Sequence, residues 1–243
     1  MLARVASRVT LQTVTRSRGM TTRTRAGPRA GRIVREDVVH ERYLTVYDRV
    51  VAFEDGTDER KDASSARAFS YDVVGHPRSG FKFVCVAPFH DRAVTASGEP
   101  EFTIVREYAQ GSNSECVVLP SGCYEPGKHE TMEEVAVEEL RQEARLAGGE
   151  LVRLIEADNP GLLETKWCMN RLTPFLSVDG LACEGEDCER DAEEFNMTHE
   201  RVTARELKKL MYGGMMMMPS VVTAQLAIER LIALGRLKPE DLV

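Results

Sequence analysis

The chain has 243 residues, of which 42% are hydrophobic, enough for one globular core with additional elements. No apolar run approaches the roughly 18 residues that a membrane-spanning helix needs, so we expect no part of the chain to cross a membrane. The formal net charge is −7 at pH 7, but it is unevenly distributed along the chain.

Residues 1–35 form a basic leader with nine arginines and no acidic residue, which leaves −16 on residues 36–243 (−7 less the +9 of the leader). The arginines are Arg4, Arg8, Arg16, Arg18, Arg23, Arg25, Arg29, Arg32 and Arg35. An acid-free leader rich in Arg, Ser and Thr predicts a disordered mitochondrial transit peptide and import into the matrix. A basic arm that binds nucleic acid is the alternative. The acidic remainder offers no broad basic surface, so we do not expect direct nucleic-acid binding there.

Six cysteines are scattered without a Cys-x-x-Cys pair or a histidine at zinc spacing. In a reducing matrix we expect free thiols. Metal binding by Cys183 and Cys188 is the alternative.

Residues 36–100 are predicted to be a strand-rich N-terminal extension. Its expected strands, rich in Val, Tyr and Phe, are Val38–Phe53, Ala68–His76 and Phe81–Phe89. The charged segment Asp55–Ser65 is expected to be a surface loop, and His90–Pro100 a turn.

Residues 101–243 are predicted to form the core domain. The expected strands are Phe102–Tyr108, Cys116–Leu119, Leu151–Ala157 and Asn170–Val178, and the expected helices are Thr131–Ala144, Ala204–Tyr212 and Val221–Leu234. A Pro-Gly turn at Pro160–Gly161 and an acidic loop, Cys183–Glu194, connect them. Strands around one helix, followed by two terminal helices, indicate an α/β sandwich.

The helix expected at Thr131–Ala144 carries the strongest chemical signal. Thr131 and Glu134 have the spacing of a capping box. At about 100° per residue, one face of the helix is apolar. It comprises Met132, Val135, Ala136, Leu140 and Ala144. Glu139 and Glu143, one turn apart, fall in the middle of this face, whereas Glu133, Glu134 and Glu138 occupy solvated positions.

Two like charges facing a core repel each other and lose hydration, and a divalent cation would offset both effects. Mg²⁺ prefers one or two carboxylates and retains waters, so Glu139 and Glu143 are predicted metal ligands, with Mn²⁺ as the alternative ion. The preceding Gly- and Pro-rich loop, which contains Gly122, can present backbone groups to a metal or a pyrophosphate. The alternative is an amphipathic helix whose glutamates lie at the edge of the face.

The stretch Gly122–Glu143 resembles the Nudix box, G-x5-E-x7-R-E-U-x-E-E-x-G-U, where U is aliphatic. The positions that fit are Gly122, Glu139, Leu140, Glu143 and Leu146, with Lys128 and His129 as two extra loop residues and Glu130 in place of the first glutamate. The letters LPSGCYEPG and FTIVREY resemble segments of ADP-ribose pyrophosphatase-like members. This resemblance implies an α/β/α sandwich with a mixed sheet, an N-terminal strand extension and a homodimer built by that extension.

The resemblance also implies Mg²⁺-dependent hydrolysis of a nucleoside diphosphate linked to another moiety, such as ADP-ribose or a nucleotide sugar. Glu143 would be catalytic through the metal. In the family a glutamate on a later loop is the general base, and Glu193 and Glu194 are the candidates here, with a solvated acidic loop as the alternative. Arg106 and Gly122 would contact the substrate. Trp167, the only tryptophan, is expected in the core rather than stacked on an adenine.

Three positions depart from the motif: Glu138 replaces an arginine, Gln142 replaces a glutamate, and Arg145 stands where glycine is expected. Loss of the arginine removes a cation that orients the neighbouring carboxylates. The departures therefore favour a second hypothesis, a catalytically inactive Nudix-fold subunit of a mitochondrial protein or ribonucleoprotein complex. A third hypothesis is an RNA 5′-end pyrophosphohydrolase.

Overall fold

The structure is a computed structural model that describes residues 31–53, 67–185, 188 and 196–243. Most of the predicted leader, the predicted loop Asp55–Ser65 and the candidate bases Glu193 and Glu194 lie outside the described residues. No helix in the described ranges is long and apolar enough to cross a membrane.

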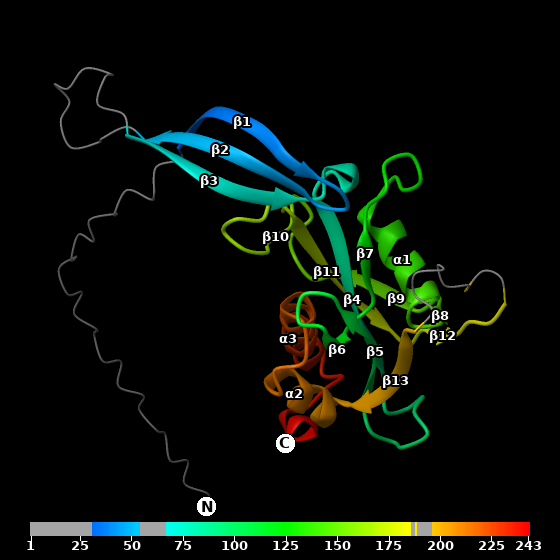
Figure 1. The fold of residues 1–243 in the computed structure, drawn as a ribbon. Coiled ribbons are helices and arrows are strands. Elements are labelled where there is room, and N and C mark those ends of the chain that lie inside the picture. The colour runs from blue at the N-terminus through cyan, green and yellow to red at the C-terminus, as the bar shows by residue number, and fades with distance from the viewer. Residues whose placement is uncertain (1–30, 54–66, 186–187, 189–195) are drawn as a thin grey trace, which may run out of the picture.

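A three-stranded antiparallel sheet projects from the rest of the molecule (Figure 1). Its strands, in spatial order, are β1 (Arg32–Glu41), β2 (Thr45–Phe53) and β3 (Arg67–Gly75). The expected single strand Val38–Phe53 is wrong, because the chain reverses at residues 42–44 and β1 pairs with β2. The reversal lets both strands satisfy their backbone hydrogen bonds within the sheet. Residues 32–35, assigned to the leader, lie in β1.

The second sheet is mixed, as the α/β prediction required. Its main path runs β10 (Leu162–Leu163), β11 (Arg171–Val178), β4 (Lys82–His90), β5 (Glu101–Ala109) and β13 (Thr198–Thr203). The remaining members are β6 (Ser114–Val118) on β5, β7 (Ser121–Cys123) on β4, and β9 (Glu150–Arg153) on β11. The pair β11–β4 is parallel, whereas the other pairings in this sheet are antiparallel.

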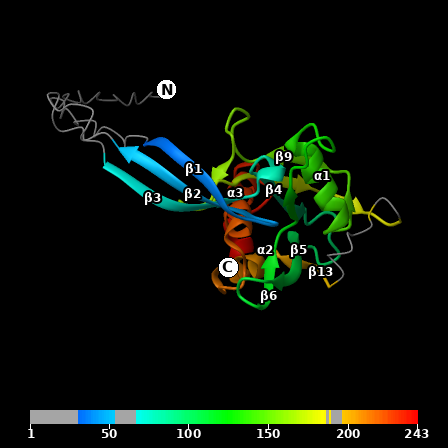
Figure 2. The ribbon, with the colours of Figure 1, turned by 45° about the horizontal axis from the view of Figure 1, so that its top comes forward.

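Helices cover both faces of this sheet, as Figures 1 and 2 show. They are α1 (Met132–Gln142) on one face, and α2 (Ala204–Tyr212) and α3 (Met218–Ala233) on the other. In β4, Val84 and Val86 pack with α1, while Cys85, Ala87 and Phe89 belong to the cluster that includes residues of α2 and α3. Successive side chains of a strand point to opposite faces, so a strand buried on both sides has a nearly continuous apolar sequence. The predicted α/β/α sandwich is confirmed.

Three smaller features differ from the sequence predictions. Helix α1 ends at Gln142 rather than Ala144, because Arg145 takes a left-handed conformation (φ 55°) and the chain enters β8 (Leu146–Ala147), which pairs with β12 (Leu181–Ala182). The predicted capping box is half formed. Thr131 accepts from the Glu134 N–H at 3.2 Å, but the Glu134 carboxylate accepts from the Glu130 N–H instead. The expected strand Leu151–Ala157 is limited to β9.

Two short 3₁₀ turns complete the described structure, at Pro77–Ser79 and Pro239–Leu242. Near the latter turn, Arg236 bridges Asp91 and Asp179 at 3.1 and 2.6 Å. This ion-pair cluster ties the chain after α3 to the ends of β4 and β11.

Candidate metal and substrate site

The loop between β6 and α1 is anchored to the central sheet before the helix begins. In β7, Gly122 pairs with Val84 and Ser121 with Cys85 of β4. The Pro120 carbonyl accepts from the Val86 N–H at 2.8 Å. Because β4 also packs against α1, this pairing holds the loop backbone beside the inward-facing side of the helix.

Glu143 is a buried carboxylate, with 4% of the residue exposed. One of its oxygens, Oε2, accepts a hydrogen bond from the Ser121 N–H at 2.8 Å. A buried carboxylate loses hydration, and a donated backbone N–H compensates part of that loss. The inward orientation predicted for Glu143 is therefore confirmed, and the loop contributes directly to its environment.

Glu139 lies one turn earlier, with its carboxylate against Gly122. A Cβ atom placed on Gly122 would overlap the Glu139 carboxylate. A larger side chain at this position would therefore displace the Glu139 carboxylate from where it lies. The structure thus brings together three of the predicted site residues, Glu139, Glu143 and Gly122.

This donor set fits a hard divalent cation that keeps much of its hydration. Mg²⁺ needs only one or two carboxylates when waters and substrate oxygens complete its octahedron. Within the described ranges, no group of three or more His, Cys, Asp or Glu side chains could hold an ion. A full protein cage is therefore not formed by these residues, whereas the pair Glu139 and Glu143 fits an ion whose coordination is completed by other oxygens.

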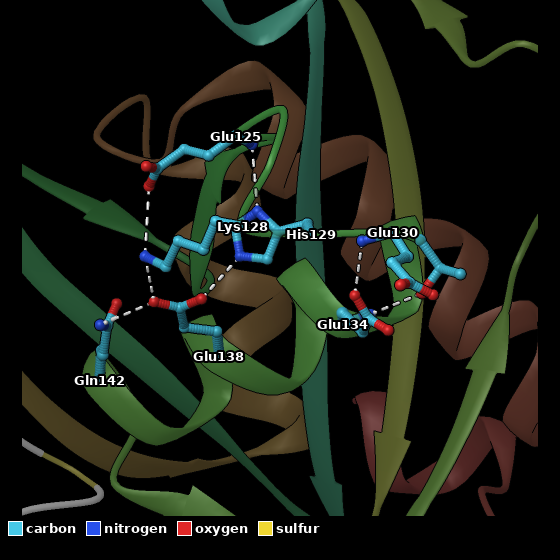
Figure 3. A network of polar contacts seen from close by, with 8 residues as sticks. Glu125, Lys128, His129, Glu130, Glu134, Glu138 and Gln142 are labelled. Atoms are coloured by element: carbon cyan, nitrogen blue, oxygen red, sulfur yellow. Dashed lines mark hydrogen bonds and ion pairs between the residues drawn. The ribbon is translucent and has the colours of Figure 1, made fainter.

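Glu138, expected to be a solvated charge, is instead partly buried in a polar network (Figure 3). Lys128 Nζ lies 2.6 Å from Glu138 Oε1, and His129 Nε2 lies 2.6 Å from Oε2. Gln142 Nε2 donates to Oε1 at 3.1 Å. Burial opposes ionisation of Glu138, but the hydrogen bonds from Lys128 and His129, together with the charge of Lys128, outweigh it and lower the pKa of the carboxyl. The expectation failed because the partners come from the loop and not from the helix.

Arg145 takes a backbone conformation that favours glycine, which accounts for the glycine expected at this motif position. Its Nη1 donates to the Cys188 carbonyl, and its own carbonyl accepts from the Cys183 N–H at 2.9 Å. Cys183 and Cys188 form a disulfide, which corrects the expectation of free thiols for this pair. Arg145 holds both ends of the segment, and the Cα atoms of the two cysteines lie 6.2 Å apart, within bridging range.

A cavity of about 590 Å³ opens where α1 ends. It lies between the residues that follow the helix, the disulfide segment, and strands β5 and β13. The side chains that line it include Thr103, Arg145, Glu184, His199 and Arg201. Its mixture of acidic and basic groups suits a polar ligand.

Arg106, the predicted substrate contact, is engaged by two glutamates. Its Nε donates to Glu200 at 2.6 Å and its Nη1 lies 3.3 Å from Glu115. The hydrogen bond with Glu200 is the main reason that the pKa of the guanidinium is raised. Along β5, Arg106 falls on the same side as Ile104, which packs in the cluster of α2 and α3. The structure therefore places Arg106 on the opposite face of the sheet from α1.

Trp167 lies on the surface, with 55% of the residue exposed, which corrects the expectation that it packs in the core. Its carbonyl accepts from the Val74 N–H of β3 at 2.8 Å, so the backbone is fixed against the N-terminal sheet. The Lys166 ammonium lies 5.1 Å from the centre of its ring. The ammonium is attracted to the face of the aromatic ring, so the exposed ring has a cation–π contact with Lys166.

No protein-family model matches the chain, and no curated protein matches it. Among solved structures it is similar to one described as the crystal structure of an ADP compounds hydrolase. The TM-score is 0.65, over 86% of this chain and 98% of that one, at 18% sequence identity. At this identity the likeness concerns the arrangement of the elements. The fold of this chain is Nudix-like.

Proposed function

We propose that this chain is a Mg²⁺-dependent Nudix hydrolase of the ADP-ribose pyrophosphatase-like type. Its substrate would be a nucleoside diphosphate linked to another moiety, such as ADP-ribose or a nucleotide sugar. The observation that carries the proposal is the buried Glu143, whose carboxylate accepts from the Ser121 N–H. One turn earlier on the helix, the Glu139 carboxylate lies directly against Gly122. The Nudix-like fold, shared with a protein described as an ADP compounds hydrolase, supports it.

The chemistry is the transfer of a phosphoryl group to water. A bound Mg²⁺ or Mn²⁺ would neutralise charge on the diphosphate and acidify the attacking water. Glu139 and Glu143 would hold the ion, while Ser121 and Gly122 keep both carboxylates in place. The water oxygen forms a bond to phosphorus, the bridging P–O bond breaks, and the water proton passes to a general base, for which Glu193 and Glu194 are our candidates.

The proposal is tested with the purified chain, a panel of nucleoside diphosphate conjugates, and Mg²⁺ or Mn²⁺. Phosphate is measured after a coupled phosphatase. We expect Glu143→Gln to lower kcat at least about 100-fold, because it removes a charged metal ligand. Substitutions of residues that only support a ligand typically cost about 10- to 100-fold. Glu133→Gln removes the same charge from the exposed side of the same helix and serves as the control. Equal turnover by wild type and Glu143→Gln would exclude the proposed role.

A second candidate function, a catalytically inactive subunit of a mitochondrial complex, is favoured by one specific contact. Gln142, at a position where the motif has a glutamate, donates its amide to Glu138. Because residue 142 is a glutamine, it supplies no carboxylate for a further metal ion. Sedimentation of mitochondrial extract distinguishes the two functions, because a subunit would sediment with a large assembly and a free enzyme would not.

The proposed location is the mitochondrial matrix, on the composition of residues 1–35. A fluorescent protein fused to this leader should enter mitochondria, and replacing its arginines with glutamine should abolish import. The proposed partner is a second copy of the chain. The projecting sheet supports this because its strands expose apolar side chains, among them Ile33, Val38, Val39, Phe69 and Tyr71.

A further inference from the structure

The loop before α1 contacts the helix on a second side, away from the inward-facing carboxylates. This outer contact involves Glu125, Lys128 and His129, and it meets the helix at Glu138, to which Gln142 of the same helix also donates (Figure 3). Lys128 and His129 are the two residues by which the loop exceeds the motif. The contact is therefore made by the two residues that lengthen the loop.

His129 connects the loop backbone to the helix through its imidazole. The ring is buried, with 7% of the residue exposed. Nδ1 accepts from the Glu125 N–H at 3.1 Å, so Nε2 carries the proton and donates to Glu138 Oε2 at 2.6 Å. The His129 N–H donates in turn to the Glu125 carbonyl at 3.0 Å, which closes the turn. The imidazole is thereby held at both nitrogens.

Lys128 adds a charged contact on the other carboxylate oxygen. Its ammonium lies 2.6 Å from Glu138 Oε1 and 3.3 Å from Glu125 Oε1. The hydrogen bond to Glu138 is the main cause of its raised pKa. Glu138 thus has a loop side chain within contact distance of each of its two carboxylate oxygens.

The same loop therefore binds α1 on two sides. On the inner side, the Ser121 N–H binds Glu143 and Gly122 contacts Glu139. On the outer side, Lys128 and His129 bind Glu138, the residue adjacent to Glu139 in sequence. Few residues separate the two contacts along the chain, so we expect a shift of the loop on the outer side to reach the inner side.

We propose that Lys128 and His129 are positioning residues. Through Glu138 they hold the loop against α1, and so keep Glu139 and Glu143 in the arrangement that binds a divalent cation. The motif has an arginine at the position of Glu138. In this chain the helix carries the negative charge, on Glu138, and the loop carries the positive charge, on Lys128. This inference rests on the proposed metal site, but it concerns residues that do not themselves contact the ion.

For one substitution, Lys128→Met, long-range charge and a positioning role predict opposite changes in Mn²⁺ affinity. Lys128→Met removes a cation from the neighbourhood of two metal-binding carboxylates. If only long-range charge mattered, Mn²⁺ would bind more tightly to this variant. If Lys128 positions the loop, Mn²⁺ binds more weakly. The sign of the change therefore separates the two explanations.

The experiment measures Mn²⁺ binding to the full chain by electron paramagnetic resonance, without substrate. We expect Lys128→Met and Glu138→Gln each to raise the Mn²⁺ Kd roughly 10-fold, the lower end of the range for groups that support metal ligands. The double variant should be no weaker than either single one, because both remove the same contact. Lys209→Met on α2 and Glu133→Gln on α1 are the matched charge controls and should change Kd less than twofold (about 0.4 kcal/mol).

Amide hydrogen exchange provides a second measurement that needs no metal. The N–H groups of Ser121 and Glu125 are bound in the wild type, and both should exchange faster in Lys128→Met. An unchanged or tighter Kd for Lys128→Met would overturn the positioning role. If the wild type binds no Mn²⁺, the proposed function fails. Faster exchange at Ser121 would then still establish the coupling between the two contacts, and unchanged exchange would refute it.

Discussion

At residue 122, glycine leaves room for the neighbouring carboxylate, and the backbone conformation itself does not favour glycine. Gly122 is absent from the positions with positive φ, yet a Cβ there would overlap Glu139. This distinguishes it from glycines such as Gly127 (φ 91°), where the conformation itself favours glycine.

Gly122→Ala should therefore impair metal binding while preserving the fold. The methyl group would push the Glu139 carboxylate away from its position, and we expect the Mn²⁺ Kd to rise roughly 10- to 100-fold, as for other disturbances next to a metal ligand. Gly111→Ala is the matched control, because its Cβ would meet open space and its φ is not positive. Wild-type Mn²⁺ affinity in Gly122→Ala would show that Glu139 is not a ligand.

Strand β4 ends in a buried histidine, His90, at the point where it pairs with β5. His90 is almost fully buried, and its Nε2 lies 2.9 Å from Thr103 Oγ1. Burial, helped by the charge of Arg201, lowers the pKa of His90 to about 4. The imidazole is therefore neutral in the folded chain over a pH range in which the unfolded chain binds a proton.

Stability should consequently fall as the pH drops from 7 to 5. Between the unfolded pKa of about 6.5 and the folded pKa of about 4, the unfolded state binds more protons, so acid favours unfolding. We expect His90 alone to account for a loss of about 2 kcal/mol between pH 7 and pH 5. Urea denaturation at several pH values measures it. His90→Gln should flatten the dependence in this interval; the carboxyls whose pKa is lowered, such as Glu138, act at lower pH. An equally steep dependence in His90→Gln would assign the effect to other groups.

At the scale of elements, periodicity predicted the helices and most of the long strands, and it missed the shortest strands. Helix α2 agrees with its predicted range at both ends, because its amphipathic pattern is bounded by Thr203, which forms a complete capping box with Glu206. Strands β8, β10 and β12 have two residues each, too few to show a period. They form only because distant segments meet, as Leu181 meets Ala147.

The whole molecule consists of a layered core and a projecting sheet that exposes apolar side chains. All ten residues of β1 are exposed. A sheet of three strands usually needs one covered hydrophobic face to be stable. A second copy of the chain would provide that cover.

Val39→Asp should therefore weaken the proposed dimer. A charge at an apolar interface loses hydration without a partner, and we expect the dimer Kd to rise at least about 10-fold. Analytical ultracentrifugation of the full chain measures the mass. Val94→Asp is the control, since Val94 is equally exposed (58% against 59%) but lies on the loop between β4 and β5. A wild-type chain that sediments as a monomer at all concentrations would exclude the dimer.

The sequence by itself determined the sandwich and the inward orientation of Glu139 and Glu143. Helix period and the pattern of apolar and polar residues are local properties, so they can be read from a single sequence. It also pointed to Gly122, which lies against Glu139, whereas the role of Glu193 and Glu194 on the later acidic loop stays a prediction. Only the tertiary structure decided that the Ser121 N–H binds Glu143, that Gly122 contacts Glu139, and that Lys128 and His129 bind Glu138. These contacts depend on how closely a strand-held loop approaches the helix, a distance that packing sets and that no spacing along the chain records.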